Sequence, residues 1–592
     1  MVTVKHFLER SVILLKKFSS SPLAIVLSIY ILSLLLIGVA GNFPVNDDFY
    51  YLMQVKTFSM GIFTKSALVS PTFILQGFLG LLWSKIFGLS YTSLRILTII
   101  ITTLCIVGVD KILKLLGIRR KIRFIALLFT TFNPIFYASS LTFMSENYCL
   151  LFLIWSVYFF LLFIRNGNWK FLLLSSIIGG MSIMVRQFGV VVFVAYLSVY
   201  IFTKRKKINF MEVLCILVPF LILGGIAFFW PKYESSLYPK STDITLFFAS
   251  FHLIVKRLTS TSVLPFVGFI LIPFTVPIFL KLRLWLKILA ISLTIPLSRL
   301  FFNVNVFKMG NLFYLEGLYA RWYVSIRQNL FNNVPFKILI SLIIAASLVL
   351  LVFYLVSKLF GFISKKKHIT IPKFENSTEL TLVVLVLGFY LASIMLDRLY
   401  DRYFVDFFIF IVIYASYRAQ KEAFKSFKFS LFLTLLLSLM VFLITYNYYK
   451  CTQVKYNLAD NLIENQKVER YQIFLDMIYA KSSYLEKKNN FDGRTPSDPQ
   501  DYNPVCFVQE YTRQHQNILN TVLSYIESRA LFTKYFPNTY IVDAGLFKDK
   551  SKRFNSTTET LFYDEEYPSP VYNLLGRSTF VRAFCVNNPI VK

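Results

Sequence analysis

The stretch that decides the fold is IVLSIYILSLLLIGVAGNFPVNDDFYYLMQV, residues 25–55. Its apolar part, Ile25 to Ala40, contains no charged side chain. Crossing a bilayer takes roughly 17–25 predominantly apolar residues. Residues 22–41 are therefore predicted to form a membrane span. Two adjacent carboxylates and three aromatic residues follow at once, which predicts functional groups at the membrane surface directly after this span.

The composition is that of a membrane protein with many spans. The chain has 592 residues, of which 56% are hydrophobic and 16% charged, and its mean hydropathy is +0.61. Its formal net charge of +31 does not indicate nucleic-acid binding, because the basic residues lie mainly in loops between apolar runs. The tail, residues 451–592, is nearly neutral, with 17 Lys and Arg against 16 Asp and Glu. Basic loops of this kind fix the orientation of spans, with the basic side in the cytoplasm.

Loop charges predict the topology. Basic residues from Lys5 to Lys17 precede the first span, so the N-terminus is expected in the cytoplasm. Residues 72–88 are short and contain Ser84 and Lys85, so they are predicted to form an interfacial or half-buried helix. About thirteen spans result, and an odd number puts the C-terminal tail outside. The expected spans after the first are residues 94–116, 124–140, 149–164, 171–185, 188–202, 211–230, 263–280, 285–302, 338–356, 380–396, 404–417 and 430–446.

The predicted fold class is thus an all-α polytopic membrane protein with a small soluble exoplasmic C-terminal domain. We expect the transmembrane catalytic domain to cover residues 1–447 and the soluble domain residues 448–592. An amphipathic helix is expected around Ile518–Leu531, and a disulfide between Cys506 and Cys585 is one of several possible pairings. The expected location is the cell membrane of a bacterium or archaeon.

Unusual residues gather on the exoplasmic face in this topology. They are Asp47 and Asp48 after the first span, Ser145, Glu146 and Asn147 in a short loop, Arg186 and Gln187 in a tight loop, and Asp397, Arg398, Asp401, Arg402 and Tyr403 near the end of a late span. Ionisable residues at span ends mark functional sites when they face the protein interior.

Each of these residues also has a plain structural interpretation. The paired carboxylates can be solvated loop residues, and Arg186 can reach lipid phosphates. Glu146 can cap a helix, and the cluster near Arg402 can be a local network of ion pairs. The occurrence of all of them on one face favours the functional interpretation.

The set suits glycosyl transfer from a lipid phosphate. A carboxylate outside the membrane can act as the general base for an acceptor hydroxyl. An inverting transfer places that base opposite the leaving group. The leaving phosphate develops negative charge, which Arg186 or Arg402 can stabilise with its forked donors.

The order of these motifs resembles a known family. "VNDDFYYLMQVKTFSMG" is similar to the acidic motif in the first exoplasmic loop of the GT-C superfamily of polyprenyl-phosphate-sugar-dependent glycosyltransferases. "SPTFILQGFLGLLWSKIFGLSYTSLRIL" resembles the following Pro-rich stretch and its G-x-S-x-x-x-x-R pattern, with Arg95 at the matching place. "FNPIFYASSLTFMSENY", "GGMSIMVRQFG" and "YDRYFVDF" continue the series. The nearest branches are the protein O-mannosyltransferases and the lipid A aminoarabinose transferases.

The resemblance covers residues 20–420 and implies roles for single residues. Asp47 or Asp48 would be the catalytic base or a metal contact, and Glu146 stands where Asp is commoner in the family. Arg186 replaces a Lys, and Arg402 and Tyr403 match the late "RY" motif. The implied donor is a sugar on a polyprenyl phosphate, and the acceptor is a lipid, glycan or protein hydroxyl. Candidate pocket residues are Tyr50, Tyr51, Tyr403 and Arg95, although membrane-interface anchoring explains the tyrosines equally well.

Metal dependence stays open at this point. The four histidines, at positions 6, 252, 368 and 515, are scattered and predict no metal site, although a divalent cation remains possible. One rival function is a transporter or flippase of lipid-linked sugars, which would show midplane polar residues and two repeated halves. Another is a polysaccharide polymerase or ligase using one large late loop.

Overall fold

A computed structural model describes the parts of the chain that position the candidate site. These are residues 21–45, 48–63, 69–70, 72–204, 208–230, 283–303, 377–395, 401–421 and 427–466, shorter pieces between 268 and 353, and four strands after residue 472. The predicted helix at Ile518–Leu531, Asp47, Asp397, Arg398 and Cys506 lie outside the described residues, as do most of the predicted spans 263–280 and 338–356.

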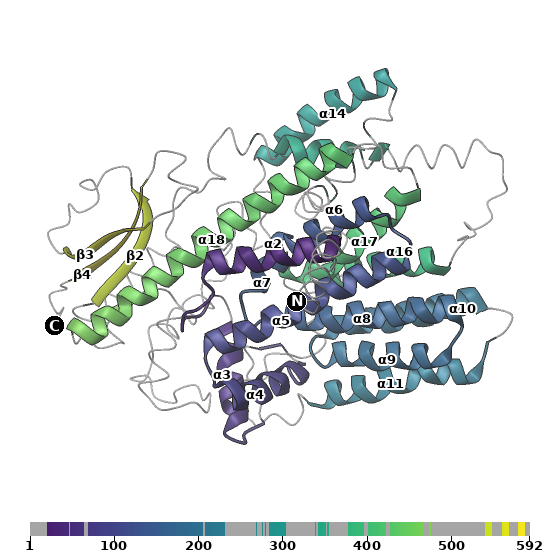
Figure 1. Cartoon of the computed structure of the whole chain (residues 1–592), viewed down its shortest axis with the longest axis horizontal. Coiled ribbons are helices and arrows are strands. Elements are labelled where there is room, and N and C mark those ends of the chain that lie inside the picture. The colour runs from purple at the N-terminus through teal and green to yellow at the C-terminus, as the bar shows by residue number, and fades with distance from the viewer. Residues whose placement is uncertain are drawn as a thin grey trace, which may run out of the picture.

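The described chain is a bundle of helices with a small sheet at one end (Figure 1). Each predicted span that is described corresponds to one or more helices. Their bounds are α2 (Pro22–Ile37), α3 (Asp48–Ser59), α4 (Leu75–Phe87), α5 (Tyr91–Leu115), α6 (Arg120–Thr131), α7 (Pro134–Ser139), α8 (Ser145–Asn166), α9 (Trp169–Ile183), η1 (Gln187–Gly189), α10 (Val190–Lys204), α11 (Phe210–Phe229), α14 (Leu284–Asn303), α16 (Ser377–Met395), η5 (Asp401–Phe404), α17 (Val405–Lys421) and α18 (Phe427–Gln466).

Local sequence sets the ends of these helices. Ser90 and Asn168 cap α5 and α9, because their side chains accept hydrogen bonds from the backbone N–H of Ser93 and Lys170. Gly167 ends α8 with φ of 68°, a left-handed conformation that glycine adopts without a steric penalty.

Five of the described helices, α5, α8, α11, α16 and α18, are long and apolar enough to cross a membrane. Their outer faces support this, since α11 leaves Leu221 65% exposed and Phe210 72% exposed. Exposed apolar surface marks contact with a membrane or with another protein, and the length and apolar composition of these helices favour the membrane. We conclude that the chain is an integral membrane protein.

The single span expected over residues 124–140 is wrong in detail. The structure has two helices there, α6 and α7, separated at Asn133 and Pro134. Pro134 has no backbone N–H to continue the helix, and the Asn133 side chain accepts hydrogen bonds from Ile135 and Phe136 instead. The break turns the chain toward the start of α8, where Glu146 lies.

Helices α3 and α4 are short and pack against each other at one end of α5 and α8 (Figure 1). At 12 and 13 residues, both are shorter than a span, which fits the interfacial helix expected at residues 72–88. The basic residues Arg120, Lys121 and Arg123 of α6 lie beyond the other end of α5, because α4 ends just before α5 begins and α6 begins just after α5 ends. Lys121 lies over the Phe427 ring at the start of α18, with its Nζ 5.5 Å from the ring centre. Helix α3, which carries Asp48, packs on α4 and thus lies at the opposite end of α5 from these basic residues.

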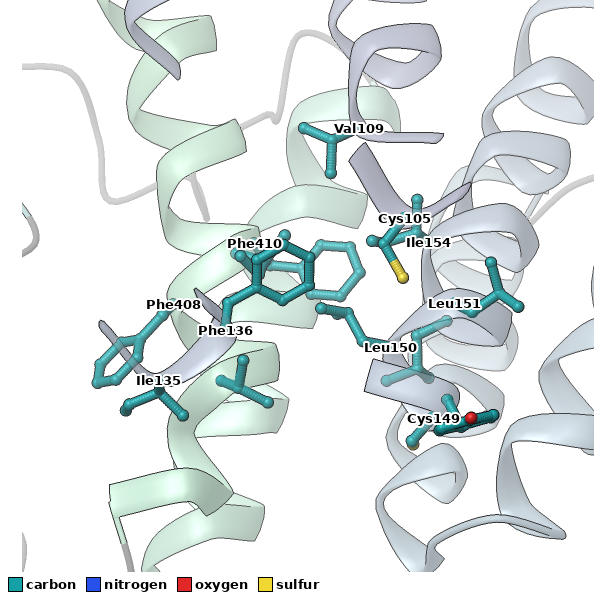
Figure 2. Close-up of a cluster of buried hydrophobic side chains, with 14 of the residues drawn as sticks. Cys105, Val109, Ile135, Phe136, Cys149, Leu150, Leu151, Ile154, Phe408 and Phe410 are labelled. Atoms are coloured by element: carbon teal, nitrogen blue, oxygen red, sulfur yellow. The ribbon is translucent and has the colours of Figure 1, made fainter. Parts of the chain in front are cut away.

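The core that supports the site is apolar. Figure 2 shows one cluster of buried hydrophobic side chains drawn from four helices. Its labelled members are Cys105 and Val109 of α5, Ile135 and Phe136 of α7, Cys149, Leu150, Leu151 and Ile154 of α8, and Phe408 and Phe410 of α17. Close packing of buried side chains gives a rigid framework, so the starts of α8 and α17 hold fixed positions relative to each other.

Helix α18 is much longer than the predicted span 430–446. It has 40 residues, which at 1.5 Å per residue is about 60 Å, twice the thickness of a bilayer core. The helix is continuous across residues 447 and 448, where the sequence predicts a domain boundary.

The far half of α18 packs against β2 and β4 of the small sheet. The strands are β1 (Ile473–Phe474), β2 (Thr539–Phe547), β3 (Glu559–Tyr567) and β4 (Ser578–Val586), in the order β1-β2-β4-β3. β1 pairs with β2 in parallel, and β4 pairs antiparallel with both β2 and β3. The sequence predicts a soluble domain here, but its pattern indicates no strands.

Candidate active site

Glu146 stands in the first turn of α8. The helix begins at Ser145, directly after the tight segment that follows α7, and the Glu146 side chain is only 1% exposed. A carboxylate is favourable at a helix N-terminus, because the helix dipole is positive there. Its partners are two arginines from distant parts of the chain.

Arg186 is the first partner. It lies between α9 and η1 in an extended conformation, and its backbone N–H donates to the Ser182 carbonyl at 2.9 Å. Its Nη1 donates to Glu146 Oε1 at 2.5 Å and to Ser145 Oγ at 3.0 Å. The Nε and Nη2 groups of Arg186 make no hydrogen bond among the described residues. That edge of the guanidinium is the one that can hold a phosphate with two parallel hydrogen bonds.

Arg402 is the second partner. Its Nε lies 3.6 Å from the same Oε1 atom of Glu146. It stands in η5, which is fixed to the preceding helix because Ser393 Oγ donates to the Tyr403 carbonyl at 2.8 Å. Two guanidinium groups thus share one buried carboxylate oxygen.

The ring of Tyr403 lies against both arginines. The Arg186 and Arg402 guanidinium carbons are 4.8 Å and 5.6 Å from its centre. Phe188 adds a second ring, 5.9 Å from that of Tyr403. Cation–π contacts of this kind hold a guanidinium plane in one orientation. Of the predicted pocket residues, Tyr403 is therefore a direct part of this cluster, which we call the Glu146 cluster.

Tyr51 reaches the Glu146 cluster from α3. Its hydroxyl lies 3.5 Å from Ser145 Oγ. Burial, together with the nearby negative charge of Glu146, raises the pKa of Tyr51 to about 12. Tyr51 is thus a neutral hydroxyl at physiological pH.

Asp48 shares a helix face with Tyr51, three residues away on α3. Its side chain is 2% exposed, and its Oδ1 accepts a hydrogen bond of 3.0 Å from the Val45 N–H. The neighbouring Tyr50 is half-buried and packs on Phe49, with ring centres 5.4 Å apart. The structure thus joins α3 to the Glu146 cluster through Tyr51, with Asp48 one turn earlier.

Arg95 has a different environment from the predicted one. It is 1% exposed, and its guanidinium donates to the carbonyls of Val39, Gly41, Phe43 and Leu141 at 2.8–3.2 Å. These donors are used within the protein, so Arg95 holds the loop after α2 and is not placed in the Glu146 cluster.

The loop before α4 is fastened to the Arg186 loop. The Ile74 and Leu75 N–H groups donate to the Met184 carbonyl at 3.1 and 3.2 Å, and Ser70 Oγ donates to the Val185 carbonyl at 3.1 Å. The segment between α2 and α5, which carries Tyr51, therefore also positions the loop that holds Arg186.

Sequence reasoning missed Asp406. It lies in the first turn of α17, is 3% exposed, and its Oδ1 is buried without a hydrogen-bond partner among the described residues. Arg186 and Glu146 are charged groups close enough to influence it. The signal was available, because a carboxylate within the apolar run "FVDFFIF" is costly unless it has a function.

The structure offers one statement on metals. No group of three His, Cys, Asp or Glu side chains within the described ranges is arranged to hold an ion. Metal dependence stays an open expectation.

The part of the chain that builds most of this cluster matches a known family. Residues 71–230 match the family model described as dolichyl-phosphate-mannose-protein mannosyltransferase. The chain resembles the GT-C glycosyltransferases. The matched segment contains Arg95, Glu146 and Arg186, whereas Asp48 and Arg402 lie outside it.

Solved structures with similar chains include those of ArnT from Cupriavidus metallidurans, one bound to undecaprenyl phosphate and one in the apo state. The first is 13% identical, covers 95% of this chain and 97% of its own, and has a TM-score of 0.33. The second is 13% identical, covers 94% and 97%, and has a TM-score of 0.36. No curated protein matches the chain.

Proposed function

We propose that this protein is an integral membrane glycosyltransferase that takes a sugar from a polyprenyl-phosphate donor. The sugar goes to a hydroxyl of a lipid, glycan or protein at the exoplasmic face. The observation that carries the proposal is the Glu146 cluster, in which two arginines converge on one buried carboxylate and one of them keeps an unused donor edge. The family match over residues 71–230 supports the same reaction class.

The Glu146 cluster suits the donor phosphate. Glu146 pairs with both arginines and thereby fixes the direction of both side chains. The Nε and Nη2 groups of Arg186 would donate to phosphate oxygens. Positive groups already held in place stabilise the negative charge that develops on a leaving phosphate, without reorganisation during the reaction.

The chemical step would be a single displacement. Asp48 or Asp47 would take the proton of the acceptor hydroxyl, and the hydroxyl oxygen would form a bond to the anomeric carbon. The bond between that carbon and the phosphate oxygen would break, which leaves the polyprenyl phosphate with the electron pair and inverts the anomeric centre. Asp48 is buried and accepts a backbone hydrogen bond, which holds its carboxylate in one direction.

The proposal includes the orientation. The N-terminus would lie in the cytoplasm, about thirteen spans would cross the membrane, and the domain after residue 447 would lie outside with the active site. The described residues support this arrangement, because Arg402 of the Glu146 cluster lies just before α17, whereas Gln420 near the other end of α17 accepts a hydrogen bond from the Arg119 N–H, directly before the basic residues of α6.

Transfer by the purified protein tests the proposal. The protein in detergent or nanodiscs is incubated with radiolabelled polyprenyl-phosphate sugars and a membrane extract that contains the acceptors. We expect label in a lipid, glycan or protein fraction, and loss of transfer in Asp48→Asn, in Asp47→Asn or in both. Absence of transfer with every donor, or full transfer in both variants, would refute the mechanism.

A further inference from the structure

The loop between α2 and α3 is held by residues of α18, about 400 positions later in the chain. Tyr449 Oη donates to the Val39 carbonyl and Tyr448 Oη donates to the Val45 carbonyl, each at 2.7 Å. Gln453 Nε2 adds a longer hydrogen bond of 3.4 Å to the Ala40 carbonyl. All three side chains belong to the second half of α18, which the proposed reaction does not use.

The opposite side of this loop is held by α5. Arg95 donates to the carbonyls of Val39, Gly41 and Phe43. The Phe43 ring fills the space between, 5.2 Å from the Tyr449 ring and 5.8 Å from the Tyr456 ring. A segment without helix or strand thus has its backbone acceptors satisfied from two sides, which restricts its motion.

The hydrogen bonds that restrain the loop also restrain Asp48, because Val45 takes part in both. The Val45 carbonyl accepts from Tyr448, and the Val45 N–H donates to Asp48 Oδ1 at 3.0 Å. One residue therefore links α18 to the carboxylate. If Tyr448 releases Val45, the donor that orients the carboxylate is released with it.

We infer that residues 448–456 of α18 position Asp48, so that this helix belongs to the transfer machinery as well as to the membrane anchor. Tyr448 and Tyr449 are positioning residues, since neither is placed in the Glu146 cluster. The inference rests on the proposed function, because it concerns the carboxylate that the reaction uses as a base. It also gives a reason for the length of α18, because its contacts with this loop, from Tyr448 to Tyr456, come after the apolar run that the sequence predicts as a span.

The alternative is that α18 only contributes packing. The packing alternative and the positioning role differ in what the hydroxyl groups of Tyr448 and Tyr449 do. Tyr→Phe keeps the ring and its apolar contacts but removes the hydrogen bond. Under the packing alternative, such variants lose some stability, yet each folded molecule works normally. Under the positioning role, the kcat of the folded molecule itself is lower.

The experiment compares full-length Tyr448→Phe, Tyr449→Phe and the double variant with Tyr446→Phe. Tyr446 is a matched control on the same helix, because it packs on Phe442 and Lys450 and its hydroxyl makes no hydrogen bond among the described residues. Folded protein is quantified by size-exclusion chromatography, and kcat and the donor KM are measured for that fraction.

We expect kcat of the double variant to fall about 10- to 100-fold, the loss typical of a small misplacement of a reacting group. The donor KM should stay within about twofold of wild type, because the arginines of the Glu146 cluster are untouched. Tyr446→Phe should match wild type. A wild-type kcat in the double variant, or an equal loss in Tyr446→Phe, would overturn the inference.

A second readout does not depend on activity. Amide hydrogen exchange of peptides covering residues 39–48 should be faster in the double variant, whereas peptides covering residues 141–150 should exchange as in wild type. Unchanged exchange over residues 39–48 would contradict the positioning role. If the wild-type protein shows no transfer at all, the proposed function fails, and the exchange experiment still decides whether α18 holds the loop.

Discussion

Glu146 and Arg186 are 40 residues apart in the chain and form an ion pair of 2.5 Å at the start of α8. Arg402, which stands directly before α17, has its Nε 3.6 Å from the same carboxylate oxygen. An ion pair buried in this way is costly to break, because one charge is then left without its partner.

Neutralising Glu146 should therefore lower stability as well as transfer, so transfer is measured per folded molecule. In Glu146→Gln the side chain keeps its shape but no longer fixes the two arginines. We expect transfer to fall by about 100-fold, the loss that follows removal of one preorganised electrostatic group. Glu379→Gln is the matched control, because Glu379 pairs with Arg418 at 2.6 Å elsewhere in the bundle. Equal losses in the two variants would show that the effect is structural.

Replacing Arg186 by Lys tests the phosphate contact. Lysine keeps the charge but lacks the Nε–Nη2 edge. We expect the donor KM of Arg186→Lys to rise about tenfold, an effect of about 1.4 kcal/mol. Arg418→Lys serves as the control for loss of a guanidinium in an ion pair. An unchanged donor KM in Arg186→Lys would place the phosphate elsewhere.

Arg95 should matter for stability. Arg95→Met removes a donor from four backbone carbonyls. The Val39 and Gly41 carbonyls keep a second donor each, whereas the carbonyls of Phe43 and Leu141 lose the one that Arg95 supplies. A buried acceptor left unpaired costs about 1–3 kcal/mol. We expect a clearly lower melting temperature in detergent and an unchanged donor KM for the fraction that stays folded. The reverse result, a wild-type melting temperature with weakened donor binding, would return Arg95 to the substrate pocket that the sequence predicted.

The phenol of Tyr51 should not set the alkaline limit of the reaction. Its pKa is raised to about 12 by burial and by Glu146, above the usual value of 10.0, so the phenol stays protonated in the folded protein up to well above pH 10. The stability that this adds is present below pH 10 and is lost between pH 10 and 12, where only the unfolded state has ionised. The alkaline limb of the kcat profile of Tyr51→Phe should therefore coincide with that of wild type below pH 10. A displaced limb would show that Tyr51 titrates during the reaction.

The orientation can be tested with single cysteines in a background without native cysteines. Asn457 on α18 and Lys121 on α6 are both exposed. A membrane-impermeant maleimide should label Asn457→Cys in intact cells and Lys121→Cys only after permeabilisation. Labelling in the opposite order would invert the topology.

The sequence predicted most of what loop charge and apolar length determine. The helices α5, α8, α9 and α11 lie close to the expected spans. The structure brings together Glu146, Arg186 and Arg402, three of the candidates that the sequence places on one face. The order of motifs along the chain was informative about the family that the sequence resembles.

Other features depend on tertiary contacts that periodicity does not encode. The helix break at Asn133 depends on hydrogen bonds from the backbone to its side chain, which hydropathy does not register. The environment of Arg95 depends on backbone carbonyls, which every residue has, so the sequence gives no signal for it. The extent of α18 was underestimated because hydropathy ends near Tyr446, whereas the helix continues as long as other parts of the protein support it.

The hydrogen bonds from Tyr448 and Tyr449 to the first loop join positions separated by 403 and 410 residues. During synthesis, the first loop leaves the ribosome long before α18 exists. The nascent chain therefore cannot complete this packing until its last span has been inserted, and transfer activity should begin only then. A chain that is interrupted before α18 would reach the membrane without a working active site, so incomplete copies would leave the donor pool untouched.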